Sequence, residues 1–598
     1  MPEQNFARAL QILQQTFGYK SFRPAQETVV KSLLEGRETV AIMPTGAGKS
    51  ICFQVPALLL NGVTVVISPL ISLMKDQVDA LLGQGIPATF INSSLDPAEI
   101  DLRINALIRG EARLVYVAPE RLENDWFQSQ LSHIPIAMVA VDEAHCLSQW
   151  GHDFRPSYRQ ISPFIRSLAR RPIVSAFTAT ATPEVRDDVI RLLELHSPAV
   201  YVSGFDRPNL FFEVRREEKK TRFIEQYIAE HPNDSGIIYA ATRKSVDKLY
   251  ETLREKGVAV GRYHAGLPDE ERKAMQEDFL YDRRPVMVAT NAFGMGIDKS
   301  NVRYVIHYNM PKNLEAYYQE AGRAGRDGEP GRCVLLFSAG DIRTQQFLIE
   351  NSTDNEERRQ RNQQLLKKMI DYCRTPLCLR QFILRYFSDD HAAEKCDHCG
   401  NCQNNTDFLD VTVDAQKVLS CVYRMRQRFG IGLVTQVLCG MENERVSAWH
   451  FDELSTYGLF RGRPQEEVKR FIHNLIMLGF LDVSPDQYAL LQLNATSFAI
   501  LKGEQTALLP VTRTEKKKAA ASSTSTADGE LFERLRAVRR TLATRDHIPP
   551  YMVFSDATLR EMSLLQPRTL EEMRAVKGVG ERKLILYAPA FLDAINAK

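Results

Sequence analysis

A short glycine-containing segment suits the binding of phosphate groups. Pro44 to Ser50 reads PTGAGKS and follows the run TVAIM, residues 39–43, that is typical of a β-strand. Glycines let backbone N–H groups approach a phosphate, while Lys49 can neutralise its oxygens and the Ser50 hydroxyl can hold Mg²⁺. Met43 stands where the common pattern has its first glycine, and the alternative is an ordinary tight turn before a helix. The segment predicts a nucleotide site.

A pair of carboxylates follows another apolar run about ninety residues later. Asp142 and Glu143 come directly after AMVAV and begin the tetrapeptide Asp-Glu-Ala-His. Ligands of open α/β sheets bind at the carboxyl ends of strands, where Asp142 would hold Mg²⁺ and Glu143 would activate water. Alone, the four residues could also be a helix cap with surface charge.

Two arginines lie in a glycine-broken segment, residues 319–328. Arg323 and Arg326 suit guanidinium groups that reach a phosphate across a cleft between domains and stabilise the transferred charge. In isolation the segment could equally be a solvated loop.

Four cysteines have the spacing of a metal site: Cys378, Cys396, Cys399 and Cys402. Four thiolates without an open position predict a structural, tetrahedral Zn²⁺ site. Cys373 and His398 are the competing ligands nearby, and free buried thiols are the alternative.

The elements that position these residues form two sets. Between residues 38 and 340, ten short β-branched runs alternate with helical patterns, and the charged stretch Phe212 to Arg222 falls between two sets of five. This alternation predicts an α/β fold with two tandem parallel-sheet domains. Helices and the cysteines come next, then helices with a hairpin that suggest a winged helix, a polar basic tether, and a small helical module. The predicted domains are 1–205, 206–340, 341–407, 408–511, a linker at 512–529, and 530–598.

The composition is that of an ordinary folded protein. Of the 598 residues, 44% are apolar and 25% are charged, and the net charge of +2 argues neither for nor against a nucleic-acid partner. The first residues lack a signal-peptide pattern, and we find no run of 18 or more apolar residues. We therefore expect a soluble, cytoplasmic protein with reduced thiols.

Together these segments resemble superfamily 2 helicases, in which ATP lies between two RecA-like domains, and in particular the RecQ family. Phe17-Gly18-Tyr19, Phe22-Arg23-Pro24 and Gln26 are similar to the adenine-recognition motif of that family. The resemblance implies that Tyr19 stacks on the base, that Gln26 bonds to its edge, and that Arg23 supports the pocket. It also implies that further nucleotide contacts come from Thr45, Gly46, Gly48 and Asp298.

Residues 147–155, LSQWGHDFR, resemble the aromatic-rich loop of the RecQ family. Trp150 and Phe154 can stack on unpaired bases and Arg155 can pair with phosphate, although a buried core role is the alternative for the aromatics. Because the loop adjoins the carboxylates, His145 and Gln149 are expected to couple base contact to hydrolysis.

The remaining segments resemble the accessory modules of RecQ proteins. Gly440, residues 455–458 and Arg461-Gly462-Arg463 resemble the winged helix, and residues 531–598 resemble the HRDC domain. The turn Gly578-Val579-Gly580 could present N–H groups to phosphate, and a plain helical interaction module is the equal alternative. The tip of the wing, at residues 484–487, has no aromatic residue for strand separation.

The resemblance implies an ATP-dependent 3′–5′ DNA helicase of repair and recombination, with ATP, Mg²⁺ and Zn²⁺ as ligands. Its partners would be single-stranded and forked DNA and single-strand-binding or other repair proteins, with no membrane partner and a monomeric state. The rivals are an RNA helicase or annealing remodeler with the same motor, and a DNA-binding scaffold with an inactive nucleotide fold.

Overall fold

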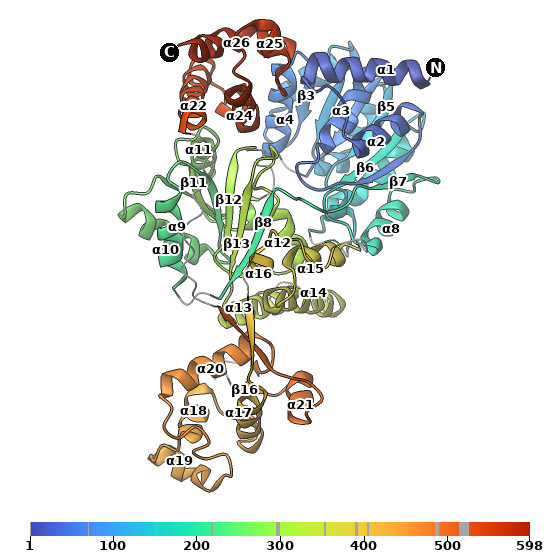
Figure 1. Ribbon diagram of the computed structural model, residues 1–598. Helices are drawn as coiled ribbons and strands as arrows, with labels where there is room; N and C mark the ends of the chain where they lie inside the picture. The colour runs from blue at the N-terminus through green and yellow to red at the C-terminus, as the bar shows by residue number, and fades with distance from the viewer. Residues whose placement is uncertain are drawn as a thin grey trace.

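The computed structural model describes residues 2–69, 71–149, 151, 153–216, 219–294, 299–351, 355–388, 393–403, 406–484, 490–512 and 526–597. Two parallel sheets form its upper part in Figure 1, and a smaller helical domain is suspended below them.

The first sheet has seven parallel strands in the order β3-β4-β2-β5-β6-β1-β7. Its strands are almost wholly apolar because helices cover both faces. The strands are β1 (Thr39–Ile42), β2 (Val63–Ile67), β3 (Ala88–Ile91), β4 (Leu114–Val117), β5 (Ile136–Val141), β6 (Ile173–Thr178) and β7 (Ala199–Val202).

Two separate groups of helices complete this first domain. One face shares its core with α2 (Pro24–Leu34), α3 (Lys49–Leu59) and α4 (Ile71–Gly83), and α1 (Pro2–Ile12) packs on α2 and α3. The other face is covered by α5 (Pro97–Ile108), α6 (Asp125–Ser132), α7 (Ile161–Ser167) and α8 (Pro183–Leu192).

The second sheet has six parallel strands in the order β10-β11-β9-β12-β13-β8. The strands are β8 (Leu210–Arg215), β9 (Ser235–Tyr239), β10 (Val260–Tyr263), β11 (Val286–Ala289), β12 (Val302–His307) and β13 (Gly331–Leu336). Helices α9 (Lys220–Glu230) and α10 (Arg243–Glu255) cover one face, and α11 (Asp269–Leu280) and α12 (Leu314–Ala321) contribute to the core on the other.

Strand β8 corrects one prediction, because part of the charged stretch between the two sets of strands belongs to the second sheet. Phe212 is buried and pairs in register with Cys333. Glu213 is charged and yet lies within the strand, where its carboxylate accepts hydrogen bonds from Arg332 at 2.8 Å and Arg215 at 2.6 Å. An edge strand tolerates such polar residues, so the charged sequence placed this stretch between the two sets of strands.

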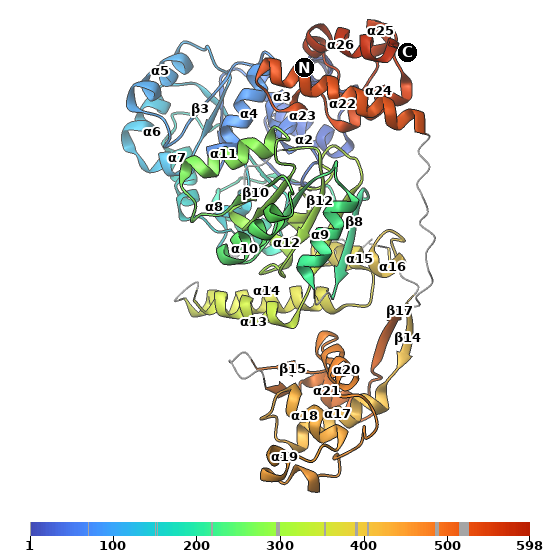
Figure 2. The same ribbon diagram turned by 90° about the vertical axis from the view of Figure 1, so that its left-hand side faces the viewer.

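After the second sheet come the zinc region and the suspended domain. The zinc region contains α13 (Ala339–Glu350), α14 (Glu356–Arg374), α15 (Leu379–Tyr386) and α16 (Gly400–Gln403). The suspended domain has its own apolar core and hangs from the ribbon of β14 (Thr406–Asp410) and β17 (Leu508–Thr512) (Figure 2). Its helices are α17 (Thr412–Arg424), α18 (Ile431–Cys439), α19 (Glu444–Ala448), α20 (Gln465–Met477) and α21 (Ala495–Leu501).

Strands β15 (Asp482–Val483) and β16 (Leu491–Gln492) form the predicted wing as an antiparallel pair. Most of its tip, residues 485–489, lies outside the described residues. Helices before a short hairpin are the arrangement expected for a winged helix.

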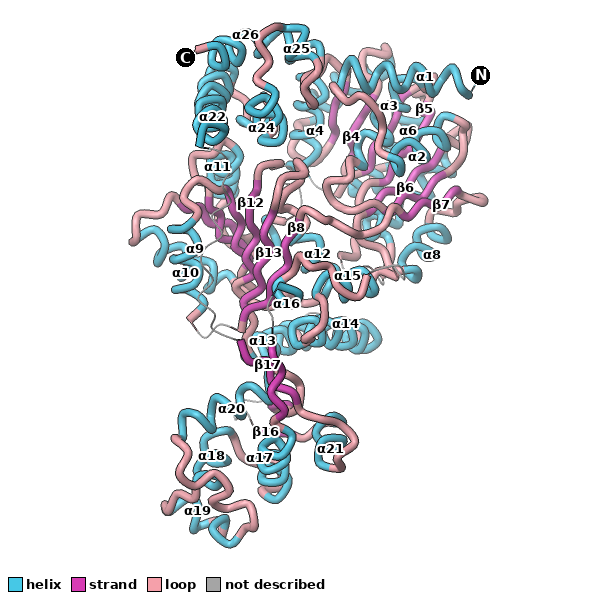
Figure 3. Tube along the Cα trace, in the orientation of Figure 1, coloured by secondary structure: helices cyan, strands magenta, loops and turns pink. Residues whose placement is uncertain are grey.

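The C-terminal domain is entirely helical where it is described (Figure 3). It contains α22 (Thr526–Asp546), α23 (Pro550–Val553), α24 (Asp556–Leu565), α25 (Leu570–Arg574) and α26 (Glu581–Asn596), and α22 begins inside the stretch predicted as a linker. Figures 1 and 2 both show it seated beside the first sheet domain, and α26 contacts the segment Leu13–Phe17. Among the described helices, none is both long and apolar enough to cross a membrane.

Candidate active site

The phosphate-binding segment joins the end of β1 to the beginning of α3. Gly46 and Gly48 have φ angles of 82° and 80°, a left-handed conformation that favours glycine. Helix α3 begins at Lys49, whose Nζ donates to the Met43 carbonyl at 3.3 Å. Burial lowers the pKa of Lys49, and the nearby carboxylates of Glu143 and Asp142 oppose that shift. The predicted cation and both predicted carboxylates therefore share one site.

The two carboxylates lie at the carboxyl end of β5. Glu143 has a φ of 46°, in the left-handed region that a non-glycine residue rarely occupies, and its N–H donates to Asp142 Oδ1 at 2.9 Å. The Tyr158 hydroxyl donates to the Asp142 carbonyl at 2.9 Å. Such strain is typical of functional sites. Carboxylate and hydroxyl oxygens suit Mg²⁺, so Asp142 and Ser50 could hold this ion.

His145 lies in the interior, with 1% of its surface exposed. Its Nδ1 lies 2.9 Å from Thr178 Oγ1 and 3.4 Å from Glu143 Oε2. Burial lowers the pKa of His145 to about 4, so its imidazole is neutral at physiological pH. The contact with Glu143 is therefore not an ion pair.

The segment predicted to recognise adenine is in contact with the phosphate-binding loop. Arg23 Nη1 donates to the Gly46 carbonyl at 2.8 Å, and Gln26 Nε2 donates to the Ala47 carbonyl at 2.8 Å. Gly48 has a left-handed φ of 80°, which strains any other residue, and a Cβ atom there would lie 2.4 Å from Gln26 Nε2 and displace that amide. Tyr19 is 45% exposed, which leaves its ring accessible to a base.

The loop that carries the two predicted arginines packs directly on the phosphate-binding loop. A Cβ atom at Gly46 would lie 3.5 Å from Arg326 Cα, and one at Gly322 would lie 3.4 Å from Thr45 Cβ. Arg323 is buried, and the charge of Arg326 contributes to the lowered pKa of Lys49. Predicted residues from both sheet domains thus meet in one closed cleft.

Arg207 also lies in this cleft, and sequence reasoning did not identify it. Its guanidinium donates to carbonyl oxygens of both loops. The available signal was its position between the two sheet domains, in the charged pair that precedes Pro208.

The aromatic-rich loop lies between the first sheet domain and the zinc region. The Phe154 ring has the Arg159 guanidinium 5.4 Å and the Arg358 guanidinium 5.8 Å from its centroid, and Arg358 belongs to α14. Arg155 Nη1 donates to the Pro69 carbonyl at 2.7 Å and Nε donates to Asp153 at 3.2 Å. Trp150 and Asp298 lie outside the described residues.

Gln149 and Phe154 line a cavity of about 520 Å³ that also borders the second sheet domain and helices α13 and α14. It includes the carboxyl ends of β9 and β12, at Tyr239 and His307. The loop predicted to bind bases therefore opens onto a space between domains rather than into a single core.

The four predicted metal ligands converge. The thiol sulfurs of Cys378, Cys396, Cys399 and Cys402 all lie within 4.8 Å of one another. Cys373 is a buried residue of α14 and is not in this group. Cys399 pairs with Phe212 of β8, so the cluster is attached to the edge of the second sheet. The donor set fits a tetrahedral Zn²⁺.

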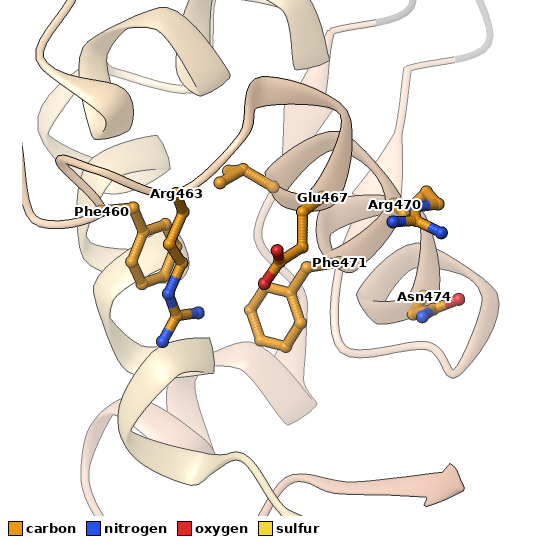
Figure 4. A pocket seen from close by; sticks show the side chains of 7 residues that line it. Phe460, Arg463, Glu467, Arg470, Phe471 and Asn474 are labelled. Carbon is orange, nitrogen blue, oxygen red and sulfur yellow. The ribbon is translucent and has the colours of Figure 1, made fainter.

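The winged helix contains a small pocket lined by charged, aromatic and amide side chains (Figure 4). A cavity of about 260 Å³ is lined by Phe460, Arg463, Glu467, Val468, Arg470, Phe471 and Asn474. Arg463 donates to Asp414 at 2.9 Å and lies over the Phe460 ring. A Cβ atom at Gly440 would lie 3.0 Å from Arg461 Nε, so that glycine leaves room for the predicted basic run.

The glycine turn of the C-terminal domain packs on the protein rather than pointing to solvent. The Gly578 N–H donates to the Gly18 carbonyl at 3.4 Å, and a Cβ atom at Gly18 would lie 2.7 Å from the Gly580 nitrogen. In this arrangement the turn does not present its N–H groups to phosphate. It adjoins the segment that carries Tyr19 instead.

The known protein families that match this chain occur along it in the same order as the regions described above. The chain matches the families described as DEAD/DEAH box helicase at residues 23–189, helicase conserved C-terminal domain at 219–328, RecQ zinc-binding at 339–403, RQC domain at 406–518 and HRDC domain at 528–595. It is 49% identical to an ATP-dependent DNA helicase RecQ of Bacillus subtilis over 99% of this chain and 98% of the relative. It is 41% identical to the RecQ helicase of Pasteurella multocida over 98% of this chain and 93% of the relative. The chain therefore belongs to the RecQ family of ATP-dependent DNA helicases.

Proposed function

We propose that this protein is a 3′–5′ DNA helicase that couples ATP hydrolysis to translocation on single-stranded DNA and to duplex unwinding. The observation that carries the proposal is the contact between the Arg323–Arg326 loop and the phosphate-binding loop, beside Lys49 and the two carboxylates. A cleft built from two domains can open and close as ATP is bound and hydrolysed. The family relationship supports a role in DNA repair and recombination.

The residues of the cleft divide the chemistry among them. Lys49 neutralises phosphate oxygens, Glu143 orients the attacking water and accepts its proton, and Arg323 and Arg326 stabilise the charge of the transition state. Asp142 and Ser50 would hold Mg²⁺, which supplies charge neutralisation at the phosphates when bound. Tyr19 stacks on adenine, while Gln26, which now contacts the phosphate-binding loop, reads the base edge when ATP is bound.

The DNA contacts belong to other elements. Phe154 and Trp150 stack on unpaired bases of the tracked strand, and Arg155 contacts its backbone. The winged helix contacts the duplex with its basic surface at Arg461 and Arg463. The protein acts as a monomer, and single-strand-binding or other repair proteins are its partners.

The test compares unwinding of DNA forks that carry a 3′ or a 5′ single-stranded tail with matched RNA forks, all with Mg²⁺ and ATP. We expect unwinding of the DNA fork with a 3′ tail, and ATP hydrolysis stimulated by single-stranded DNA. Preferred unwinding of RNA would favour an RNA helicase. DNA binding without hydrolysis in the wild type would favour a scaffold with an inactive nucleotide fold.

A further inference from the structure

The chain passes from the first sheet to the second through a short hinge. Strand β7 ends at Val202 and β8 begins at Leu210, so the hinge comprises residues 203–209. Arg207 lies in the middle of this segment and is only 9% exposed. A buried arginine in a hinge requires acceptors for its guanidinium, because a buried charge without partners is costly.

The acceptors come from both sides of the nucleotide cleft. Arg207 Nη1 donates to the Thr45 carbonyl in the phosphate-binding loop and, at 3.3 Å, to the Gly322 carbonyl. Nη2 donates to the carbonyls of Ala324 at 3.1 Å and Gly325 at 2.8 Å. One planar group therefore links the loop that holds phosphate to the loop that carries Arg323 and Arg326.

The geometry of these contacts favours the closed cleft. If the two loops separated, the guanidinium would lose the carbonyl acceptors of one loop, and those hydrogen bonds would have to be replaced. A lysine cannot replace it well, because its compact ammonium has three donors and lacks the fork that reaches several carbonyls at once. The neighbouring positions are also tight, since a Cβ atom at Gly46 would lie 3.3 Å from Arg207 Nη1.

The zinc region also contacts this hinge. Helix α15 follows Cys378 directly, and its Arg380 is 6% exposed. The Arg380 guanidinium donates to Asp206 Oδ1 and the Leu210 carbonyl, both at 2.5 Å, and to the carbonyl of Arg207 itself at 2.7 Å.

An aromatic contact adds to this connection. Phe387, at the end of α15, stacks on Phe205 of the hinge with ring centroids 4.5 Å apart and planes 17° apart. The backbone that carries Arg207 therefore contacts a helix that begins directly after Cys378 of the four-cysteine cluster.

We propose that Arg207 is a positioning residue for ATP hydrolysis, which sets the Arg323–Arg326 loop against the phosphate-binding loop, and that Arg380 of the zinc region fixes Arg207 for this task. The inference rests on the proposed function. The zinc region then contributes to ATP hydrolysis as well as to stability. Its contact with the hinge determines where Arg207 lies in the nucleotide cleft.

The test measures steady-state ATP hydrolysis at saturating single-stranded DNA together with the affinity for a fluorescent ADP. For Arg207→Lys we expect kcat to fall by about 100-fold, the scale of a misplaced catalytic geometry. ADP affinity should change by less than about threefold, because Lys49 and the N-terminus of α3 still hold the phosphates. Arg380→Lys should also lower kcat, while the protein keeps its zinc and its melting temperature.

A double variant decides whether the two arginines act through one connection. If Arg380 acts through Arg207, the kcat of Arg207→Lys/Arg380→Lys equals that of Arg207→Lys alone rather than the product of the two losses. The control is Arg171→Lys, at a partly buried arginine of the first domain that donates to Glu38 at 2.8 Å. Its kcat should match the wild type.

Four results would overturn the inference in whole or in part. A kcat for Arg207→Lys within twofold of the control rejects the role of Arg207, and so does an equal loss of kcat and ADP affinity. Multiplicative losses in the double variant reject the link from Arg380 through Arg207. A wild type without DNA-stimulated hydrolysis rejects the proposed function instead, so the two failures are distinguishable. If Arg207→Lys does not fold, an unchanged kcat in folded Arg380→Lys still rejects the connection.

Discussion

The imidazole of His145 and the carboxylate of Glu143 are 3.4 Å apart, and the same imidazole nitrogen lies 2.9 Å from the Thr178 hydroxyl at the end of β6. A buried neutral ring thus connects Glu143, the carboxylate that we propose activates water, to the neighbouring strand. His145 lies in the turn Ala144–Leu147 that leads to the aromatic-rich loop, so movement of that loop can reach Glu143 through a short, packed connection.

The buried state of His145 predicts a specific pH dependence of stability. Its pKa is about 4 in the folded protein and about 6.5 when unfolded, so its contribution is complete above about pH 6.5 and is lost as pH falls through about 4. The contribution is at most about 3 kcal/mol. Between pH 6.5 and 4.5, the free energy of unfolding of the first domain should fall more steeply in the wild type than in His145→Gln. Parallel curves would contradict the assignment, and the exposed His133→Gln variant serves as control.

The aromatic-rich loop should control stimulation by DNA. In Phe154→Ala, DNA-stimulated hydrolysis should decrease far more than DNA-independent hydrolysis, because stacking of a base can no longer move the loop. Loss of stacking should also weaken binding of single-stranded DNA by about 1–3 kcal/mol. Trp150→Ala is expected to behave alike.

Saturating single-stranded DNA separates affinity from coupling in these variants. A variant that regains full stimulation at saturation has lost only affinity, which would refute the coupling. Trp126→Ala alters a half-exposed aromatic residue of α6 and should retain wild-type stimulation.

The cysteine cluster should hold one zinc per chain and stabilise the zinc region. Four-thiolate binding contributes folding energy directly, so Cys396→Ser or Cys399→Ser should lose metal and solubility together. Cys439→Ser, at a buried thiol of the winged helix, should keep its zinc. Elemental analysis that finds no zinc in the purified wild type would exclude the metal site.

The contact between the C-terminal domain and the nucleotide site should affect ATP affinity. In Gly580→Ala, the new Cβ would lie 3.1 Å from the Thr16 carbonyl and 3.5 Å from the Gly18 nitrogen, so it should weaken docking. The KM for ATP should rise by about 2- to 10-fold, the loss of one hydrogen bond, with kcat nearly unchanged. Gly529→Ala meets nothing within 4 Å and is the control. An unaltered KM in Gly580→Ala would show that the contact does not support the Tyr19 segment.

Much of the fold and of the candidate site was predictable because it follows from strong local patterns in the sequence. The buried strands of both sheets are continuous apolar runs, and the four cysteines have a spacing typical of a metal site. Strand β8 was missed because Glu213 and Arg215 have charged partners at a sheet edge, so its sequence lacks the continuous apolar run of the other strands.

The remaining features depend on contacts between distant segments. Arg207 is an ordinary charged residue in the sequence, and its acceptors at Gly322 to Gly325 lie more than a hundred residues away. The glycine turn at residues 578–580 gave no indication that it packs on Gly18, because that contact joins opposite ends of the chain. Gln26 matched an adenine-binding pattern, whereas its contacts here with the phosphate-binding loop follow only from the folded geometry.

The most direct test of the central claim measures ATP hydrolysis and unwinding of a 3′-tailed DNA fork by the wild type, Lys49→Ala and Glu143→Gln under one condition. We expect that both variants bind the fork nearly as the wild type does, that Glu143→Gln still binds ATP, and that neither hydrolyses ATP nor unwinds DNA measurably. Hydrolysis at the wild-type rate in either variant would contradict the assignment of this cleft as the motor's active site.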